Sequence, residues 1–200
     1  MSTSRDDILN RINTARAGMT TPLVERTYGT SLTLSRKELL YLFEDRILDY
    51  QATFVRTADV ASTISNILAE YGLRNILLPA GLPAEWAMGT TDFNLSPEQL
   101  DQFDCVITSS ELGIAATGTI VLNHSDSTQG RRAISLVPDT HICIVQEENV
   151  VGTVVEAIRA LNPKEHQTWI SGPSATSDIE LERVEGVHGP RNLHVILMTK

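Results

Sequence analysis

The chain is poor in cysteine, which excludes some kinds of redox site. It has two cysteines among 200 residues, whereas an iron–sulfur cluster normally takes four thiolates. Cys105 and Cys143 lie in separate apolar, strand-like runs, and free cysteine is among the most buried residue types. We expect reduced, buried thiols, with a disulfide between them as the less usual alternative. We expect no metal or cofactor in this chain, so that any iron–sulfur chemistry would belong to another chain.

Long apolar runs and an excess of positive charge are also lacking. No run of about 18 apolar residues is present, which argues against a membrane span, and the start lacks the features of a secretory signal. The formal net charge is -9 and the sequence pI is about 5.0. Non-specific nucleic-acid binding needs clustered Lys and Arg. We therefore expect a cytoplasmic protein with neither a membrane span nor a nucleic-acid partner.

The composition that remains is that of a soluble globular protein, with 42% apolar and 20% charged residues. Two hundred residues suit one ordinary domain. Residues 4–17 predict an amphipathic helix with Ser4 as its N-cap, residues 18–32 a linker, and residues 36–50 a second helix. We therefore expect a helical arm over residues 1–50 and an α/β domain over residues 51–200.

Strand and helix patterns alternate along the second part. Strands are predicted over residues 52–56, 75–80 and 104–108, and helices over residues 57–71 and 97–103. Three strands then follow without a helix, over residues 119–123, 133–137 and 142–146. A helix over residues 150–161 and strands over residues 168–171 and 193–198 complete the chain. This order predicts a mixed, mainly parallel sheet flanked by helices, with an antiparallel portion or hairpin.

The stretch GPSATSDIELERVEGVHGPRNLHVIL, residues 172–197, concentrates chemistry-bearing side chains between strand-like segments. Asp178, Glu180, His188 and Arg191 lie there beside glycines and prolines. Glycine allows a close approach of backbone to a ligand, and proline fixes the course of a loop. Together with ELGIAATGTIVL, residues 111–122, the stretch indicates a polar pocket at strand ends.

Two further segments allow more than one interpretation. The amides of Thr117, Gly118 and Thr119 could hold an anion, or the segment could be a tight turn into a strand. Arg131 or Arg132 could bind a carboxylate or phosphate, or both could be solvated in a turn. Alternation along a strand would send the two arginines to opposite faces, so at most one would face a pocket.

Acidic residues and histidines are equally ambiguous. Asp178 and Glu180 could form an acid–base pair or part of a solvated acidic face. His188 lies in a Gly- and Pro-containing loop and is a candidate site residue, whereas His194 lies in a strand and suits the core. Zinc-site spacing is missing, and Ser174 lacks the Gly-x-Ser-x-Gly context of a nucleophile elbow.

Three ordered segments together give the sequence a family resemblance. They are GIAATGTIVL (113–122), RRAISLVPDTHICIV (131–145) and the stretch 172–197. The chain resembles the lactate-utilisation protein C family, the LUD domain, over roughly residues 50–200. The resemblance implies a fold similar to the sugar-phosphate isomerase and coenzyme A transferase superfamily.

The resemblance also implies a function and a set of site positions. It implies a subunit of an L-lactate utilisation system that oxidises L-lactate to pyruvate together with iron–sulfur partner proteins, which would hold the clusters. Apart from the resemblance, the guanidinium of Arg191 could hold a small carboxylate or phosphate ligand in bidentate fashion. The matching pocket positions are Thr117, Gly118, Thr119, Pro138, His141, Gly172, Pro173, Ser174, Asp178, Glu180, His188, Gly189, Pro190 and Arg191. Arg131 is a further candidate site residue because of its guanidinium.

One position departs from the family pattern. Relatives usually have an acidic residue before Thr-Gly-Thr, whereas this chain has Ala116. If that carboxylate is catalytic in relatives, the chemistry here is lost or has moved to Glu111. The catalytic candidates are therefore Glu111, Glu180 and His188. Two alternatives stay open: a stand-alone enzyme of the isomerase or acyl-transfer type, and a ligand-sensing or scaffold protein.

Overall fold

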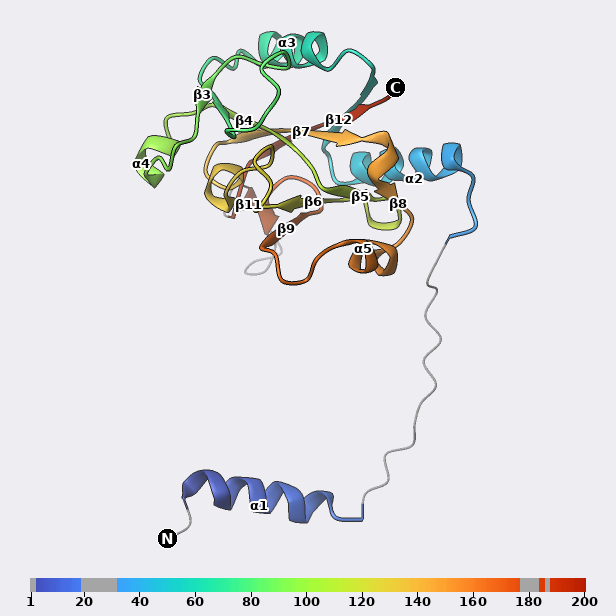
Figure 1. Ribbon diagram of the computed structural model, residues 1–200, viewed down its shortest axis with the longest axis vertical. Helices are drawn as coiled ribbons and strands as arrows, with labels where there is room; N and C mark the ends of the chain where they lie inside the picture. The colour runs from blue at the N-terminus through green and yellow to red at the C-terminus, as the bar shows by residue number, and fades with distance from the viewer. Residues whose placement is uncertain (1–2, 19–31, 177–183, 186–187) are drawn as a thin grey trace.

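The computed structural model describes residues 3–18, 32–176, 184–185 and 188–200 (Figure 1). Its centre is a six-stranded sheet in which every neighbouring pair is parallel, in the order β1-β12-β7-β4-β2-β3. The mainly parallel α/β fold is thus confirmed. The strands are β1 (Thr53–Thr57), β12 (Asn192–Met198), β7 (Thr140–Gln146), β4 (Cys105–Ser109), β2 (Ile76–Leu78) and β3 (Thr90–Thr91).

A separate four-stranded sheet contains the antiparallel pairs. Its order is β8-β5-β6-β9, with β6 antiparallel to both β5 and β9 and with β8 parallel to β5. The antiparallel portion was expected, but β7 is not part of it, because β7 pairs in parallel with β4 and β12. The strands are β8 (Val150–Val151), β5 (Leu112–Ile114), β6 (Thr119–Asn123) and β9 (Gln167–Ile170); β10 (Ala175–Thr176) and β11 (Val184–Glu185) form a short ribbon.

The expected strand over residues 133–137 is wrong. This segment contains η2 (Arg132–Ser135), a turn of 3-10 helix. Ile134 is buried there against Leu77, Leu100 and Val106. A short apolar run can bury its side chains as a helical turn or as a strand, and its length does not distinguish the two. The expected helix over residues 150–161 likewise begins with β8, and only α5 (Val154–Ala160) is helical.

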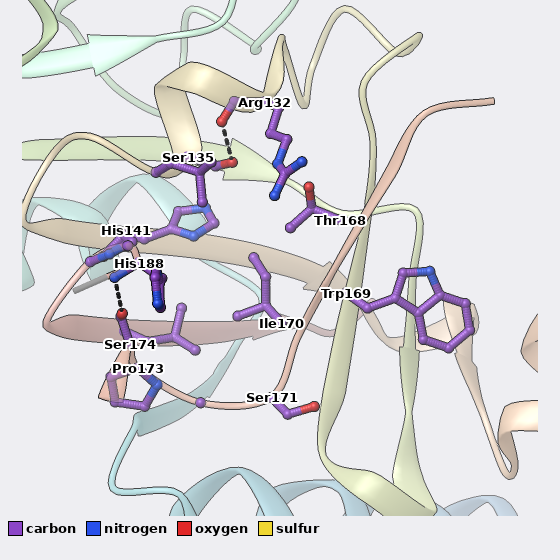
Figure 2. A pocket seen from close by; sticks show the side chains of 15 residues that line it. Arg132, Ser135, His141, Thr168, Trp169, Ile170, Ser171, Pro173, Ser174 and His188 are labelled. Carbon is purple, nitrogen blue, oxygen red and sulfur yellow. Dashed lines mark hydrogen bonds between the residues drawn. The ribbon is translucent and has the colours of Figure 1, made fainter. Parts of the chain in front are cut away.

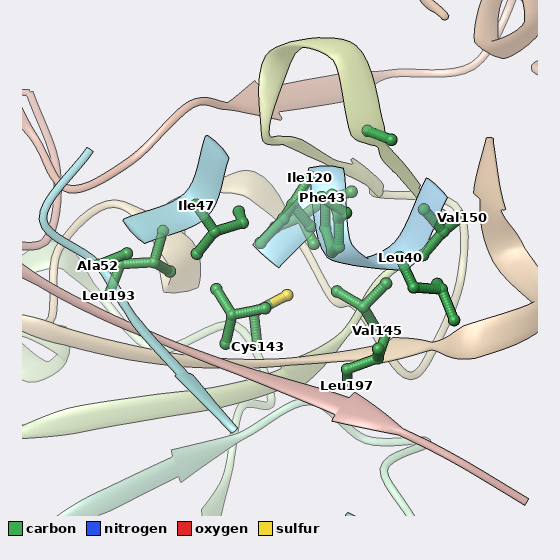
Figure 3. Close-up of a cluster of buried hydrophobic side chains, with 13 residues drawn as sticks. Leu40, Phe43, Ile47, Ala52, Ile120, Cys143, Val145, Val150, Leu193 and Leu197 are labelled. Atoms are coloured by element: carbon green, nitrogen blue, oxygen red, sulfur yellow. The ribbon is translucent and has the colours of Figure 1, made fainter. Parts of the chain in front are cut away.

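Helix α2 (Arg36–Asp49) begins at a capping box, in which Ser35 and Glu38 satisfy each other's backbone amides. Leu40, Phe43 and Ile47 recur at helical spacing on its buried face. Figure 3 shows them over side chains from the parallel sheet, in one cluster with Cys143, Val145, Leu193, Val195 and Leu197. The expected boundary after residue 50 therefore does not coincide with a break in packing.

Helix α3 (Val60–Tyr71) covers the other face of the parallel sheet (Figure 1). Successive strand residues point to opposite faces. Accordingly, Ile142 and Ile144 of β7 pack in the cluster of α3, whereas Cys143 and Val145 pack in the cluster of α2. The remaining short elements are α4 (Pro97–Leu100), η1 (Ala115–Thr117) and η3 (Glu147–Asn149).

Helix α1 (Ser4–Arg16) buries none of its residues and lies apart from the α/β core in Figure 1. Its N-cap is Thr3 rather than Ser4, and Thr3 and Asp6 form a capping box. Of the helices in the described ranges, none combines the length and the apolar character that crossing a membrane requires.

Candidate functional site

A cavity of about 320 Å³ opens at the amino ends of the parallel strands β7 and β12. His141 and Leu193, the second residues of these strands, pair in register and reach the cavity. Open α/β sheets more often bind ligands at the carboxyl ends of their strands. The cavity is lined by Arg132, Ser135, Leu136, His141, Thr168, Trp169, Ile170, Ser171, Gly172, Pro173, Ser174, His188, Gly189, Pro190 and Leu193.

The charge of the lining favours an anion. Arg132 provides a guanidinium, while His141, His188 and several hydroxyl groups add polar atoms (Figure 2). Among the described residues of the lining there is no aspartate or glutamate. A guanidinium can bind a carboxylate or phosphate through two parallel hydrogen bonds. The cavity is therefore suited to a small anion.

His141 is a buried, neutral member of the lining. Its exposed fraction is 1%, and its Nε2 lies 2.8 Å from Thr108 Oγ1. Burial, with a smaller effect of nearby His194, lowers the pKa of His141 to about 4. At neutral pH the imidazole is therefore uncharged, and a neutral imidazole has one donor and one acceptor nitrogen.

Two segments far apart in the sequence form one wall. The Ser174 amide donates to the Pro190 carbonyl at 2.8 Å, and the His188 amide donates to Ser174 Oγ at 3.0 Å. Gly172 has φ +85, and a Cβ there would lie 2.5 Å from the Cβ of Tyr50. Residues 172–174 and 188–190 thus lie together, and position 172 requires glycine.

The Thr-Gly-Thr segment lies behind this wall rather than in it. Thr119 Oγ1 is 2.8 Å from the hydroxyl of Ser171, a lining residue, and 2.7 Å from Thr117 Oγ1. Gly118 has φ +57, and a Cβ there would lie 2.7 Å from the backbone of Arg46. The structure therefore gives this glycine a steric role, as the tight-turn interpretation requires. The hydroxyls of the segment support Ser171.

The two arginines singled out by the sequence are engaged outside the cavity. Arg131 forms a bidentate ion pair with Asp92 at 2.6 and 2.9 Å, and this contact lowers the pKa of that carboxyl. Arg191 binds Asp139 in the same way at 2.5 and 2.8 Å. Only one of the adjacent arginines faces the cavity, as expected, and it is Arg132.

Of the catalytic candidates that the structure describes, only His188 lines the cavity. Glu111 follows the carboxyl end of β4, whereas the cavity lies at the amino ends of the parallel strands. It accepts a hydrogen bond from Gln129 Nε2 at 3.3 Å. Asp178 and Glu180 lie outside the described residues. Ala116 is exposed within η1, and Pro138 is buried before β7, outside the lining.

Several lining residues had no distinct signal in the sequence. Arg132 directly follows Arg131, the arginine that the sequence indicated, and its place at the cavity depends on the turn η2. Thr168 and Ser171 belong to a strand-like run without a motif, and Ser135 lies in η2, which the sequence predicted as a strand. Only pairing of β9 with β6 brings Thr168 to the cavity.

Neither cysteine lies in the lining. Cys105 and Cys143 are free and buried, as expected. Burial raises the pKa of each thiol to about 12. In the part of the chain that the structure describes, no group of three or more His, Cys, Asp or Glu side chains is placed to bind a metal ion.

Comparison with known proteins gives matches over nearly the whole chain. A "Lactate utilization protein C" of Deinococcus radiodurans is 45% identical over 203 residues, covering 96% of this chain and 94% of that protein. A protein of the same name from Bacillus subtilis is 32% identical over 143 residues, covering 65% of this chain and 58% of that protein.

A solved structure and a family model agree with these relatives. The crystal structure of a DUF162 family protein from Deinococcus radiodurans has a TM-score of 0.71 and 41% identity, covering 82% of this chain and 98% of that one. The family model of the LUD domain matches residues 17–198. The chain therefore belongs to the LUD domain family.

Proposed function

We propose that this protein is a subunit of an L-lactate utilisation system. In this system L-lactate is oxidised to pyruvate, and this chain binds the small carboxylate in the cavity at the amino ends of β7 and β12. The relatives named lactate utilization protein C support the assignment to lactate. The observation that carries the ligand assignment is the guanidinium of Arg132 in a cavity whose described lining has no carboxylate.

The size of the cavity agrees with a small ligand. Its volume of about 320 Å³ is at the lower end of the range for small-molecule sites, roughly 300–1,000 Å³. Leu136, Ile170 and Leu193 give it apolar walls, which suit the methyl group of a three-carbon acid. Arg132 would hold the carboxylate, and neutral groups such as His141 would meet the second oxygen.

The proposal assigns the electrons to partner chains. Oxidation of L-lactate to pyruvate removes two electrons and two protons, so an acceptor must take them. We assign this role to iron–sulfur clusters in partner proteins, because two separated, buried cysteines are too few for a standard four-thiolate cluster. In this scheme the chain is a non-autonomous component.

The test is reconstitution of lactate-dependent dye reduction. The full chain is assayed alone, then with the candidate iron–sulfur proteins, and then with each component omitted. We expect reduction only in the complete mixture, and pyruvate formation in proportion to it. Full activity in a mixture that lacks this chain would refute the proposal.

A matched substitution separates this proposal from a stand-alone enzyme. Glu111→Gln changes a carboxylate near the carboxyl ends of the parallel strands, away from the cavity at their amino ends. We therefore expect it to leave reconstituted activity unchanged. A stand-alone isomerase or acyl-transfer enzyme that uses Glu111 as base or nucleophile would lose its activity in the same variant.

A further inference from the structure

We infer that the cavity distinguishes a 2-hydroxy acid from the corresponding 2-oxo acid. His124 accepts the one hydrogen of the Thr168 hydroxyl, so Thr168 Oγ1 can act toward a ligand only as a hydrogen-bond acceptor. The inference rests on the proposed function for one point only, which is that the ligand carboxylate binds Arg132. It adds a specificity-determining pair that lies outside the conspicuous sequence motifs.

The first step fixes the tautomer of His124. Its Nδ1 lies 2.8 Å from the carbonyl oxygen of Gly130, and a carbonyl can only accept, so Nδ1 must bear the hydrogen. Burial lowers the pKa of His124, and nearby Arg132 and His166 lower it further. The ring is therefore neutral at neutral pH, and its Nε2 has a free lone pair.

The second step fixes the direction of the Thr168 hydroxyl. His124 Nε2 lies 2.7 Å from Thr168 Oγ1. Because Nε2 has no hydrogen in this tautomer, the hydroxyl must donate to it. A hydroxyl has a single hydrogen, so Thr168 Oγ1 can offer only lone pairs to a ligand in the cavity that it lines.

The third step places this acceptor beside the anion-binding group. Figure 2 shows the Thr168 hydroxyl and the Arg132 guanidinium at the same end of the cavity. The effect of Arg132 on the pKa of His124 agrees with that proximity. A ligand whose carboxylate binds Arg132 would therefore bring its second carbon close to Thr168.

The chemical consequence follows from what each ligand can donate. The hydroxyl of L-lactate has a hydrogen and can donate to Thr168 Oγ1. The keto oxygen of pyruvate has none, so it would face lone pairs. One neutral hydrogen bond of this kind changes affinity by about 3- to 10-fold. The cavity should therefore bind the substrate of the proposed oxidation more tightly than its product.

The experiment compares L-lactate and pyruvate as probes of the purified full chain by calorimetry. In the unmodified protein we expect L-lactate to bind about 3- to 10-fold more tightly. Thr168→Val keeps the branched shape but removes the oxygen, so the two affinities should become equal, mainly through weaker lactate binding. His166→Gln is the control, because His166 lies outside the cavity lining, and it should keep the preference.

The pH dependence tests the role of His124 without a substitution. Protonation would place a hydrogen on Nε2, which would then donate to Thr168 Oγ1 and turn the hydrogen of Thr168 toward the cavity. The groups that face His124 are Gly130, Thr168, Arg132 and His166. We expect the preference for L-lactate to fall as the pH is lowered through the pKa of His124, which burial holds below the ordinary histidine value of about 6.5. Thr168→Val should show no such change.

The outcomes separate this inference from the proposed function. Equal binding of both acids to the unmodified protein, lost in Arg132→Ala, would overturn the inference and leave the carboxylate site in place. Binding of neither acid would overturn the ligand assignment and the inference with it. A preference for L-lactate that survives in Thr168→Val would assign the discrimination to another group.

Discussion

At the scale of single residues, two arginines adjacent in the sequence have different roles. Arg131 is bonded to Asp92, a carboxylate whose side chain is only 7% exposed, and to the Leu95 carbonyl. Arg132 is exposed at the cavity, and within the described ranges no carboxylate is paired with it. The first arginine therefore stabilises the fold, and the second is available to a ligand.

We predict that substitution of Arg132 weakens ligand binding, whereas substitution of Arg131 lowers the stability of the fold. Arg132→Ala should weaken binding of the lactate anion about 10- to 100-fold, the loss expected for one charge-assisted hydrogen bond. The free energy of unfolding of the Arg132→Ala variant should differ from that of the unmodified protein by less than about 0.5 kcal/mol, as for other exposed substitutions. Calorimetry and urea denaturation measure the two quantities.

Arg131→Ala is the matched control. It should lower the free energy of unfolding by about 1.5–3 kcal/mol, because it leaves Asp92 without its charged partner. The lactate affinity of the folded protein should change little. The reverse pattern, with affinity lost in Arg131→Ala alone, would show that the anion site has been placed at the wrong arginine.

His141 gives a prediction about pH and stability. Its pKa in the folded protein is about 4, below the ordinary value of about 6.5 in an unfolded chain. The unfolded state therefore takes up a proton first as the pH falls, so the contribution is complete above pH 6.5 and is lost toward pH 4. Between pH 7 and pH 5 the loss from this residue should be about 2 kcal/mol.

The measurement is urea denaturation of the unmodified protein and of His141→Asn at pH 7 and pH 5. His124 and His194, whose pKa values are also lowered by burial, are retained in both proteins. The difference between the two pH dependences therefore isolates His141. An identical pH dependence in the variant would contradict the neutral, buried state.

At the scale of elements, the two N-terminal helices differ in what they contact. α1 buries none of its residues, and its Ile8 is 57% exposed. α2 places Phe43 in the main core cluster, and a Cβ on Gly113 of β5 would lie 2.7 Å from the Phe43 ring. α2 is thus a layer of the core.

We predict that equivalent substitutions in the two helices differ in cost. Phe43→Ala should lower the free energy of unfolding by about 3–5 kcal/mol, because a buried ring is replaced by a cavity. Ile8→Ala should change it by less than about 0.5 kcal/mol. Urea denaturation tests both variants, and a large cost at Ile8 would reveal a contact of α1 with the core.

At the scale of the whole molecule, the two sheets and their helices form stacked layers with both cysteines inside. Cys105 packs in the cluster of α3 and Cys143 in the cluster of α2, on opposite faces of the parallel sheet. Both thiols have a pKa raised to about 12 by burial. Only the thiolate is nucleophilic, so opening of the core must precede any reaction.

We predict that the native protein does not react with a thiol reagent at neutral pH, while two thiols react after unfolding in urea. The rate in the native protein should follow the opening of the core, and it should rise in the destabilised variant Phe43→Ala. Rapid modification of either cysteine in the stable native protein would contradict the burial of both.

Local patterns in the sequence determined much of the parallel sheet and of one cavity wall. Alternation in β7 sends Ile142 to α3 and Cys143 to α2, and the α–β order correctly indicated parallel pairing. Segments 172–174 and 188–190, which were expected at one polar pocket together with residues 117–119, lie side by side. Residues 117–119 lie outside the cavity lining. Such features depend on residues close in sequence, whose periodicity and turn chemistry can be recognised directly.

Only the tertiary structure decided that the cavity lies at the amino ends of the parallel strands, and which polar groups reach it. A period of two residues does not tell which sheet a strand joins, so the place of β9 and of Thr168 depended on pairing with β6. The turn η2 places Arg132 at the cavity, whereas Arg131, the candidate from the sequence, binds Asp92 outside it. His124 acquires its role from Gly130 and Thr168 together, and the contact with Thr168 forms only when β6 and β9 pair.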